Sequence, residues 1–573
     1  MASSSPSSLI ERRREQMFPV LNPAQVEIAR RFDGERRRFK ADEIVFEVGQ
    51  AGVPAYLVLL GSIQVVRRDG LGHESEITTH GPGELTGDIS QLAGGPTLTL
   101  GRAGVNGAEA VSFDSARLRS LVIATSEIGE AIMRAFILRR AFLIETGAGL
   151  VLLGASDTPV AVQLQNFLRR NFIPYTMLDP GVDADAASLI EHLGISQAEL
   201  PLAVCPNGTI LRSPHEKTLA QCLGLLPSFL ADRSYDVAIV GAGPAGLAAA
   251  VYAGSEGLSV LVLDAHSPGG QAGTSARIEN YLGFPTGISG EALLGRAYTQ
   301  AQKFGAVTAI PAEVKLLKAA PNDASSDGRA YELELDEGQP VRAAAIIIAS
   351  GARYRKLDLP NLSSFEGRGV YYWASPIESK LCARREVVVV GGGNSAGQGT
   401  VFLASHVSRV HLLVRGASLS EAMSQYLVTR IGALLNVEVH TETELTQLIG
   451  EPAEGLQAVC WGHRPSGKEE RRAIHHVFLF IGAMPNTDWL KRCAVSVDTK
   501  GFVQTGEPAT ALTAATEGSK RGSLPLETSL PGVFAVGDVR AGSVKRVSAA
   551  VGEGAAVVAQ LHGYLHAIRP EHH

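Results

Sequence analysis

Hydrophobic and polar positions alternate differently in successive parts of the chain, and the first part predicts a β domain. Up to about Thr146, short apolar runs such as YLVLLGSIQVV are separated by glycine-rich turns, a pattern typical of a small antiparallel barrel or jelly roll. From Ser115 the apolar residues recur at helical spacing, so we expect helices to close this domain. We assign residues 1–147 to it.

A second pattern begins at about Gly149 and predicts the element order β-α-β-α-β-β-α. The strand GLVLLGAS precedes a helical stretch, and the last two strands are joined by a hairpin turn at Asn207–Gly208. The run PSFLADR follows the closing helix, and we interpret it as a linker. We therefore expect residues 148–230 to form a small α/β domain.

A third pattern extends from Tyr235 onward, where the strands are continuous apolar runs such as DVAIV, SVLVLD, AAIIIAS and EVVVV. Such runs are typical of parallel sheets that are buried on both faces. The polar stretch 509–525 interrupts this region, and we expect it to form a surface loop. The fold class is thus multidomain, with a β domain, a small α/β domain and three-layer α/β domains.

Composition and charge narrow the function only slightly. The 573 residues are 45% hydrophobic and 19% charged, which is typical of a globular protein, and their formal net charge of −6 does not suggest binding to nucleic acid or to an anionic membrane. No apolar run approaches the roughly 20 residues that span a bilayer. The N-terminus also lacks the apolar core of a secretory signal, so we expect a cytoplasmic protein without a membrane segment.

The cysteines are few and widely spaced, and no Cys-x-x-Cys occurs. Neither a zinc ribbon nor a local dithiol motif is therefore available, and we predict no metal site. A reducing compartment fits this cysteine usage best. The cysteines are Cys205, Cys222, Cys382, Cys460 and Cys493.

The run YDVAIVGAGPAGLAAAVYAGSEGLSVLVLDA carries the strongest motif, a glycine-rich turn between a strand and a helix. Gly241 permits the tight turn, Gly243 lets a pyrophosphate approach the backbone, and Gly246 lets helix and strand pack closely. Asp264 ends the next strand and is placed to bind ribose hydroxyls. The candidate dinucleotide contacts in the turn are Gly241, Gly243, Pro244, Ala245 and Gly246.

A second turn of the same kind lies in EVVVVGGGNSAGQGTVFLASHVSRVHLLVRG. The count of 23 residues that leads from Gly241 to Asp264 leads from Gly391 to Val414, which Arg415 follows. An apolar residue with an adjacent arginine favours NADP over NAD, unless Arg415 only caps a surface turn. The candidate contacts are Gly391, Gly393, Asn394, Ser395, Ala396 and Arg415.

Two such turns, with returning sequence after the second, resemble the thioredoxin reductase family over about residues 235–567. The resemblance implies that the first turn binds FAD and the second binds NADPH or NADH. It also implies a discontinuous FAD domain, made of residues 233–355 and 488–567, with the NAD(P)H-binding domain at 356–487 between its halves. A homodimer is implied as well.

Shorter stretches carry the same resemblance. Gly269–Gln271 and Glu279–Asn280 are similar to segments that flank the flavin ring, and Gly537–Asp538 is similar to the motif whose aspartate contacts the ribityl and phosphate part of FAD. The stretch 545–548 stands where the family places a segment at the pyrimidine edge of the flavin. The cofactor-binding residues implied in this way are Gly270, Gln271, Asn280, Gly351, Gly537, Asp538, Arg546 and Val547.

The family's redox motif is missing. A Cys-x-x-Cys followed by aspartate normally precedes the second turn, but this chain has the residues 373–377, Trp-Ala-Ser-Pro-Ile, at that place. The thiolate that attacks the flavin, its partner thiol and the proton-handling aspartate are therefore all absent. We assign no catalytic residue beyond the flavin. Trp373 either gates access to the flavin or is a packed core residue.

The middle domain resembles the thioredoxin or glutaredoxin fold, with Leu200-Pro201 where that fold has a cis-proline. The sequence has residues 156–159, Ser-Asp-Thr-Pro, where the active-site cysteines would stand. We expect Cys205 and Cys222 to be two buried, small apolar side chains, and this domain to bind or dock. A Cys205–Cys222 disulfide as electron acceptor remains the alternative.

The N-terminal domain resembles cyclic-nucleotide-binding domains, because GPGELTGDISQLAGGPTLTL matches their phosphate cassette in shape. Gly87-Asp88 replaces the usual Gly-Glu, and the phosphate-binding arginine falls at Leu98 or, with a shifted register, at Thr97. Arg102 is no obvious substitute. A cyclic phosphate needs a cation or many N–H donors, so we do not expect cyclic nucleotide binding here. Scaffolding, dimerisation or another ligand remain open.

The expected function is that of an FAD-containing, NAD(P)H-dependent oxidoreductase whose flavin passes electrons to an acceptor other than a disulfide. The acceptor classes are a quinone, oxygen, an electron-transfer protein and a small molecule. Two alternatives stay open. One is a flavin- and nucleotide-binding sensor or scaffold without turnover, and the other is a thioredoxin-disulfide reductase that uses distant cysteines.

Overall fold

The computed structural model divides into two compact units. The first comprises residues 1–235, 253–267 and 299–313, and the second comprises the remainder. Residues 509–523, most of the polar stretch predicted as a surface loop, lie outside the described residues. The described residues are 13–68, 74–146, 149–192, 194–226, 233–275, 277–319, 331–336, 340–451, 454–506 and 524–568.

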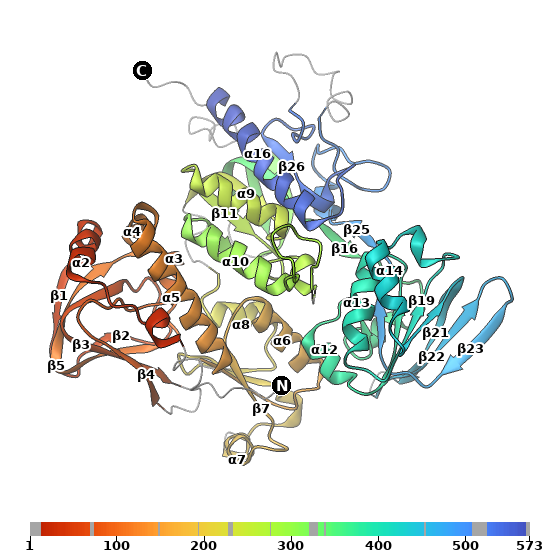
Figure 1. Ribbon diagram of the computed structural model, residues 1–573, viewed down its shortest axis with the longest axis horizontal. Helices are drawn as coiled ribbons and strands as arrows, with labels where there is room; N and C mark the ends of the chain where they lie inside the picture. The colour runs from red at the N-terminus through yellow and green to blue at the C-terminus, as the bar shows by residue number, and fades with distance from the viewer. Residues whose placement is uncertain are drawn as a thin grey trace. The chain divides into compact units, whose positions relative to one another are not determined.

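An antiparallel sheet of five strands forms the N-terminal part of the first unit, as the apolar runs predicted (Figure 1). Its strand order is β1-β5-β3-β4, and β2 pairs with β5. Helices follow β5, so the change of period at Ser115 is confirmed. The elements are α2 (Pro23–Ala29), β1 (Arg36–Phe39), β2 (Ile44–Phe46), β3 (Ala55–Arg68), β4 (Glu74–His80), α3 (Ile89–Ala93), β5 (Leu100–Phe113), α4 (Ser115–Ala124) and α5 (Ser126–Glu145).

The closing helices are fixed to the sheet by their apolar faces. The Asp114 side chain caps α4 by accepting a hydrogen bond from the Arg117 backbone N–H. Leu118, Leu121 and Phe136 are almost fully buried, and they belong to the same core cluster as residues of β3 and β5. Burial of such side chains stabilises the folded state by about 1.5–3 kcal/mol each.

The predicted order β-α-β-α-β-β-α is observed in the next part of the first unit. The sheet order is β7-β6-β8-β9, in which β6 and β7 are parallel and the other neighbours antiparallel. The Leu200-Pro201 bond before β8 is cis, as predicted. The elements are β6 (Leu150–Leu153), α6 (Pro159–Arg170), β7 (Tyr175–Leu178), α7 (Ala184–His192), β8 (Leu202–Val204), β9 (Ile210–Arg212) and α8 (Glu216–Cys222).

The two cysteines of this domain form a disulfide, so the prediction of two unbonded, buried thiols was wrong. Cys205 directly follows β8 and Cys222 ends α8. The β8–β9 hairpin and α8 bring their Cα atoms to 6.5 Å, a separation that a disulfide spans. Sequence spacing could not show this, because the pairing depends on how α8 packs against the sheet.

A seven-stranded sheet has the order β12-β11-β10-β15-β14-β13, and β26 pairs with β15. β26 lies parallel to β15, with Val533 opposite Ile346, so segments far apart in the sequence build one sheet. Its strands are β10 (Ser234–Val240), β11 (Val260–Leu263), β12 (Val307–Ala309), β13 (Val314–Ala319), β14 (Tyr331–Leu335), β15 (Val341–Ile348) and β26 (Val533–Ala535). Its helices are α9 (Pro244–Ser255), α10 (Gly290–Lys303) and α16 (Val547–Ile568).

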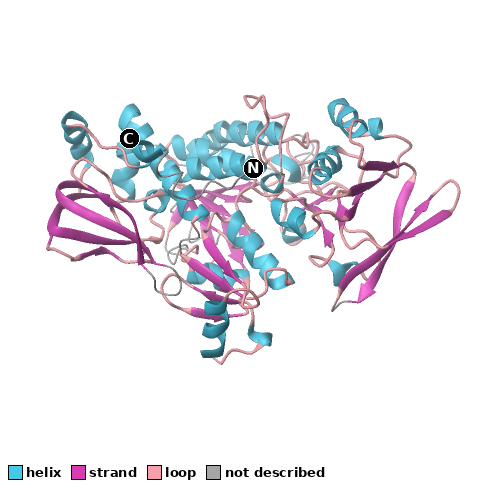
Figure 2. Ribbon diagram, turned by 60° about the horizontal axis from the view of Figure 1, so that its bottom comes forward, coloured by secondary structure: helices cyan, strands magenta, loops and turns pink. Residues whose placement is uncertain are grey.

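A five-stranded parallel sheet of order β17-β24-β18-β19-β20 holds the second glycine-rich turn in the second unit. The antiparallel sheet β21-β22-β23 accompanies it, and its strands are visible at the right of Figure 2. The elements are β16 (Ala352–Tyr354), β17 (Val370–Tyr371), α12 (Pro376–Leu381), β18 (Glu386–Val390), α13 (Asn394–Ala404), β19 (Arg409–Leu413), α14 (Gln425–Gly432), β20 (Val437–His440), β21 (Thr443–Glu451), β22 (Gly455–His463), β23 (Lys468–Arg472), β24 (Val477–Leu479) and β25 (Ala483–Pro485).

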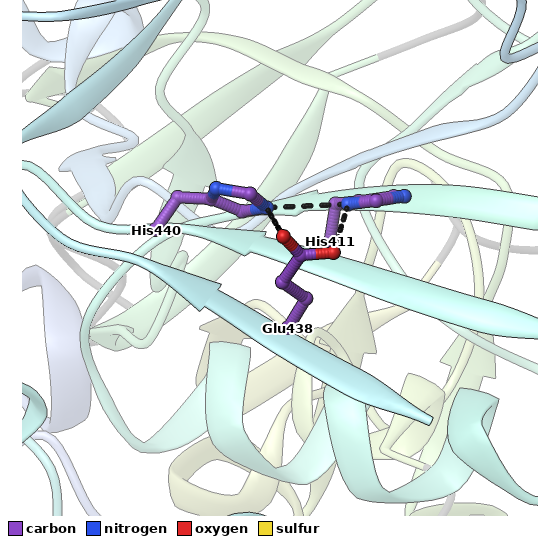
Figure 3. Close-up of side chains that lie close together, drawn as sticks. All are labelled: His411, Glu438 and His440. Atoms are coloured by element: carbon purple, nitrogen blue, oxygen red, sulfur yellow. Dashed lines mark hydrogen bonds and ion pairs between the residues drawn. The ribbon is translucent and has the colours of Figure 1, made fainter. Parts of the chain in front are cut away.

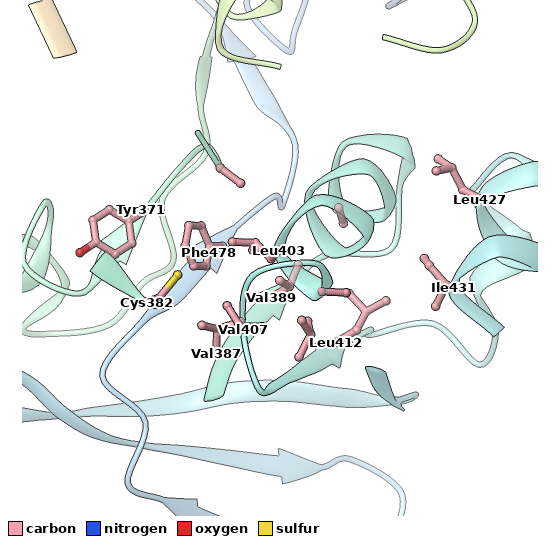
Figure 4. Close-up of a cluster of buried hydrophobic side chains, with 14 of the residues drawn as sticks. Tyr371, Cys382, Val387, Val389, Leu403, Val407, Leu412, Leu427, Ile431 and Phe478 are labelled. Atoms are coloured by element: carbon pink, nitrogen blue, oxygen red, sulfur yellow. The ribbon is translucent and has the colours of Figure 1, made fainter. Parts of the chain in front are cut away.

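The three central strands of the parallel sheet, β24, β18 and β19, are buried on both faces because they are mostly apolar. Val387 and Leu412 face the cluster that includes residues of α13 and α14 (Figure 4). Val388 and Leu413 belong to the opposite cluster, which contains Trp461 of β22. Among the helices of the described residues, none is long and apolar enough to cross a membrane.

Candidate functional site

The first glycine-rich turn has two positions that only glycine can occupy. Gly241 has φ +114°, and a Cβ there would lie 2.2 Å from the Ala349 carbonyl oxygen. A Cβ on Gly246 would lie 1.8 Å from the Gly241 carbonyl oxygen. The turn can therefore close, and α9 can approach β10, only without these side chains.

The middle glycine of this turn faces open space. A Cβ on Gly243 would meet no atom within 4 Å. Pro244 begins α9 directly after it, at the position where its missing N–H costs no hydrogen bond. The N-terminal N–H groups of a helix and its positive dipole end favour a phosphate at such a place. The turn thus has both the room and the polarity for a pyrophosphate.

Other predicted residues of the second unit converge on this turn. A Cβ on Gly270 would lie 3.1 Å from the Gly243 Cα, and one on Gly537 would lie 2.8 Å from the Ala245 Cβ. The Gln271 side-chain amide donates a hydrogen bond to the Ala352 carbonyl, next to Gly351 (2.6 Å). Segments from three distant parts of the sequence therefore surround one cradle of glycine residues.

Asp538 follows Gly537 and brings a half-buried carboxyl group to this cradle. Burial raises its pKa, and the nearby Lys545 ammonium partly offsets that rise. The Lys545 Nζ also donates a hydrogen bond to the Asp538 carbonyl oxygen (2.7 Å). The carboxyl group is thus suited to accept hydrogen bonds from the hydroxyl groups of a bound polyol. These hydrogen bonds would replace the water contacts that the carboxyl group loses on burial.

The remaining predicted residues of the first site are Asp264, Asn280 and Arg546. In the first unit, the Asp264 carboxylate follows β11 and accepts hydrogen bonds from the His266 and Ser267 backbone N–H groups (2.9 and 3.2 Å). Asn280 is exposed. Arg546 is exposed and directly precedes Val547, the first residue of α16.

The second turn repeats the geometry of the first. Gly391 has φ +145°, and a Cβ there would lie 2.3 Å from the Phe480 carbonyl oxygen and 3.1 Å from the Ala396 Cβ. Gly393 precedes α13 and supplies no side-chain cap to its first turn. Asn394 accepts a hydrogen bond from the Ser424 backbone N–H (2.7 Å), and Ser395 is exposed. Uncapped N–H groups again face outward at a helix N-terminus.

The loop after β19 carries charges of both signs. Val414 is buried and Arg415 is exposed. The Glu421 carboxylate accepts hydrogen bonds from the Ala417 and Ser418 backbone N–H groups, both at 3.2 Å. Arg415 is therefore the cation that this loop exposes to solvent. The Glu421 side chain instead stabilises the loop through its hydrogen bonds to the loop backbone. Sequence reasoning missed Glu421, which belongs to a Ser418-x-x-Glu421 capping pattern.

The segment 373–378, which precedes the second glycine-rich turn in the sequence, is held by a buried carboxylate. Glu378 is 1% exposed, and it accepts hydrogen bonds from the Trp373 indole N–H (3.1 Å), from the Ser375 backbone N–H (3.1 Å) and from the Ser375 hydroxyl. The half-buried Trp373 ring also lies 6.4 Å from the Tyr354 ring of β16. Sequence reasoning missed Glu378, although Ser375-x-x-Glu378 is a capping-box pattern.

Cys382, the cysteine nearest to this segment in the sequence, is a buried and unreactive thiol. Cys382 is 0% exposed, and its Sγ donates to the Glu378 carbonyl oxygen (3.0 Å). Burial raises the pKa of its thiol to about 12. Cys460 and Cys493 are half-buried and unbonded, so the described residues of the second unit hold no disulfide.

Removing the Glu378 carboxylate is expected to destabilise this domain strongly. Glu378→Ala removes the carboxylate that accepts hydrogen bonds from the half-buried Trp373 and the buried Ser375, which costs about 2–4 kcal/mol of unfolding free energy. Urea denaturation followed by tryptophan fluorescence measures the loss. Glu444→Ala, at an exposed position of β21, is the matched control. Equal urea midpoints for the two variants would contradict the stabilising role of Glu378.

The N-terminal domain has a small cavity at the predicted phosphate cassette. Its volume is about 40 Å³, and Leu98, Phe142 and Leu143 contribute apolar walls to it. The Asp88 carboxylate accepts a hydrogen bond from the Ser90 N–H (2.7 Å), so it caps α3. Such a volume holds a few water molecules and is far too small for a cyclic nucleotide without rearrangement.

A buried arginine lines this cavity, and its guanidinium is already hydrogen-bonded to backbone carbonyl oxygens. The Arg139 guanidinium donates to the carbonyl oxygens of Met17, Leu85 and Gly87 (2.7, 2.9 and 2.7 Å). Burial lowers its pKa to about 10. Sequence reasoning missed Arg139, which lies on α5 outside the cassette. Its hydrogen bonds hold the cassette to the N-terminal segment and to α5.

Two parts of the chain match known families. Residues 235–554 match the family described as pyridine nucleotide-disulphide oxidoreductase, and residues 36–124 match the cyclic nucleotide-binding domain. The chain is 30% identical over 324 residues to a thioredoxin reductase of Mycoplasmopsis pulmonis, covering 56% of this chain and 95% of that protein. It is 31% identical over 350 residues to an alkyl hydroperoxide reductase component of Pseudomonas putida, covering 59% of each.

The chain is also similar to solved structures of thioredoxin reductases. A Lactococcus lactis thioredoxin reductase has a TM-score of 0.51 and 25% sequence identity, covering 58% of this chain and 99% of its own. A thioredoxin reductase of T. acidophilum has a TM-score of 0.50 and 28% identity, covering 58% of this chain and 98% of its own. The family match at residues 235–554 includes both glycine-rich turns.

Proposed function

Because the chain belongs to the pyridine nucleotide-disulphide oxidoreductase family, and is thereby a flavin- and NAD(P)H-dependent oxidoreductase, we propose that its electron acceptor is not a protein disulfide. The family implies FAD at the first turn and NADPH or NADH at the second. When bound, the flavin supplies electron transfer between a nicotinamide and an acceptor. The acceptor is a quinone, oxygen, an electron-transfer protein or a small molecule.

The residues at both turns fit these cofactors. Gly243 leaves room for a pyrophosphate, and Gly241 and Gly246 leave room for the backbone that cradles it. Asp538 supplies a half-buried carboxyl group for hydroxyl groups of the bound molecule. At the second turn, the uncapped N-terminus of α13 supplies N–H donors for phosphate oxygens, and its glycine residues admit them.

The observation that carries the proposal is the hydrogen-bonded segment of Trp373, Ser375 and Glu378. By the family resemblance, residues 373–377 stand at the chain position of the family's two cysteines and its aspartate, and they contain no sulfur. Cys382, the nearest cysteine in the sequence, has a pKa of about 12 and is fully buried, so it does not supply a thiolate at neutral pH. The Glu378 carboxylate accepts a hydrogen bond from the Trp373 indole N–H, which holds the Trp373 ring in place and so shapes the approach to the site.

Anaerobic titration of the flavin-loaded protein with NADPH and with NADH tests the proposal. We expect the oxidised flavin absorbance to bleach, and an acceptor screen with a quinone, oxygen and a one-electron dye to restore it. Thioredoxin, added as a disulfide, is the comparison acceptor. Rapid turnover with thioredoxin alone contradicts the proposal. Absence of bleaching with either nicotinamide supports instead a sensor or scaffold without turnover.

Arg415 is expected to set the preference for NADPH. Arg415→Ala removes the charge-assisted hydrogen bond to a 2′-phosphate, worth about 1.5–3 kcal/mol, which corresponds to about a 10- to 100-fold weaker affinity for NADPH. NADH carries no such phosphate, so its affinity stays unchanged. Fluorescence titration with both nucleotides measures the split, with Arg464→Ala, an exposed arginine of the same domain, as control. Equal losses for both nucleotides contradict the assignment.

A disulfide reductase that works through Cys205 and Cys222 is the second candidate. The observation that favours it is the disulfide itself, which lies in a domain whose element order resembles the thioredoxin fold. Against it stands the absence of the family's Cys-x-x-Cys from the sequence, which leaves no thiol pair for the preceding step. We propose that this domain docks a partner and that the disulfide is structural.

For the N-terminal domain we propose a scaffolding or dimerisation role without cyclic nucleotide binding. Leu98 stands in the apolar wall of the small cavity, and the buried Arg139 is bonded to backbone carbonyls. Calorimetric titration of the full chain with cyclic AMP and cyclic GMP is expected to show no binding. Saturable binding of either nucleotide contradicts this proposal. The homodimer implied by the family resemblance stays a prediction.

A further inference from the structure

A cluster of two histidines and a glutamate lies on the parallel sheet of the second unit, outside both glycine-rich turns. β19 and β20 are parallel neighbours, and His411 stands opposite Glu438. Side chains two residues apart on a strand share a face, so Glu438 and His440 point to the same side of β20. The register therefore brings all three side chains to one face of the sheet (Figure 3).

The ligand atoms of this cluster are spaced as around a single ion. The His411 Nδ1 lies 3.2 Å from the His440 Nε2 and 3.5 Å from the Glu438 Oε2. The His440 Nε2 lies 3.7 Å from the Glu438 Oε1. Metal–ligand distances of 2.0–2.1 Å in a tetrahedron place neighbouring ligand atoms about 3.3 Å apart. The three side chains thus need only small adjustments to hold one ion.

The surroundings of the cluster are those of a supported metal site. The other ring nitrogen of His411, Nε2, lies 3.2 Å from the Glu386 carboxylate, which fixes the ring orientation and leaves Nδ1 as the unprotonated ligand atom. His411 is 1% exposed. The Trp461 ring packs against both imidazoles, at centroid distances of 5.3 and 5.4 Å. The ligand set is therefore partly shielded from water and held by packing.

The charges at the cluster are also suited to a cation. Glu386 and Glu438 bring two carboxylates, while Arg409 lies 3.4 Å from the Glu438 Oε2. The Arg409 side chain is 54% exposed, so this ion pair is weak and an incoming ion displaces it at little cost. Two neutral imidazoles and a carboxylate are ligands that borderline divalent ions prefer over Mg²⁺ or Ca²⁺.

We propose that His411, Glu438 and His440 bind one divalent transition-metal ion of the Zn²⁺ class. Three protein ligands leave the fourth tetrahedral position for water or another small ligand. The prediction of no metal site followed from the cysteine spacing and did not consider histidines on neighbouring strands. The site is independent of the proposed electron acceptor, because none of its ligands belongs to the glycine-rich turns.

The ion would strengthen a part of the sheet that supports the second turn. The Val414 backbone N–H donates to the His440 carbonyl oxygen (2.9 Å), and the Gly391 N–H donates to the Leu413 carbonyl oxygen (3.0 Å). An ion that joins β19 to β20 therefore fixes β19, which leads into the Arg415 loop and pairs with β18, the strand that precedes Gly391. Its binding is expected to raise the thermal midpoint of the protein, because the ion binds the folded form.

Calorimetric titration of the full-length, chelator-treated protein with Zn²⁺ tests the site. We expect one ion per chain and a rise in the thermal unfolding midpoint. His440→Gln and Glu438→Gln should abolish this saturable binding. Glu386→Gln should weaken it by about 10- to 100-fold, the usual effect of losing the partner of a ligating histidine. Glu438 is half-exposed, so its variant keeps the fold even if a histidine variant does not.

His406→Gln is the matched control, because His406 is an exposed histidine of the same domain and hydrogen-bonds to Ser405 rather than to the cluster. It should bind Zn²⁺ as the unaltered protein does. Absence of saturable binding by the unaltered protein overturns the proposal and makes the cluster a hydrogen-bonded histidine pair. Binding that survives in both Glu438→Gln and His440→Gln also overturns it.

Discussion

Replacing Gly246 with alanine is expected to yield purified protein without bound flavin. The new Cβ would lie 1.8 Å from the Gly241 carbonyl oxygen, which is backbone and cannot rotate away. The turn must then open, at a cost of about 3 kcal/mol or more, which corresponds to at least a 100-fold weaker affinity for FAD. The ratio of flavin absorbance to protein absorbance after gel filtration measures the loss.

Gly243→Ala separates loss of the cofactor from loss of the fold. A methyl group there meets no atom within 4 Å, so the flavin-free variant should unfold at the same urea concentration as the flavin-free unaltered protein. It would, however, fill the space reserved for the pyrophosphate, so we expect FAD affinity to fall in this variant too. Unchanged FAD affinity in Gly243→Ala would contradict the assignment of this turn to FAD.

Replacing both disulfide cysteines with serine is expected to weaken the middle domain without affecting electron transfer. The Cys205–Cys222 bridge closes a loop with a sequence separation of 17, and its loss costs about 3 kcal/mol by the loop-entropy argument. Hydrogen exchange of the β6–β9 sheet measures this loss locally, since a chain of several domains need not unfold in one step. Flavin reduction by NADPH and reoxidation by the acceptor should keep their rates.

The same variant discriminates between the two candidate functions. A disulfide reductase that works through Cys205 and Cys222 would lose its turnover in the double serine variant. Cys460→Ser, at a half-buried unbonded cysteine of β22, controls for the general effect of removing a thiol. Loss of turnover in the double variant but not in this control would contradict a structural role for the disulfide.

Local motifs carried most of the correct predictions, because their geometry is set by neighbouring residues. Gly241 and Gly391 have positive φ angles, and Gly246 lies too close to the Gly241 carbonyl oxygen to carry a side chain. The order of strand, turn and helix in the sequence was therefore enough to identify these glycines. The change of period at Ser115 likewise marked where the β sheet gives way to helices.

The residues that sequence analysis missed depend on contacts between distant segments. Cys205 meets Cys222 only because α8 folds back onto the sheet, and His411 meets His440 only through the register of β19 and β20. The alternation in Val-Glu-Val-His at 437–440 does put Glu438 and His440 on one face. That signal becomes meaningful only when the neighbouring strand is known. Glu378 is different, since its capping pattern was visible in the sequence and was overlooked.

The buried state of Cys382 has a consequence for how the protein responds to chemical stress. Because burial raises the pKa of this thiol to about 12, it stays protonated at pH 7, whereas alkylating agents, arsenicals and peroxides react with the ionised form. Enzymes that rely on an exposed dithiol are inactivated by such compounds. We therefore expect Cys382 to be spared, so electrophiles and oxidants that stop a dithiol reductase would not inactivate this protein through that thiol.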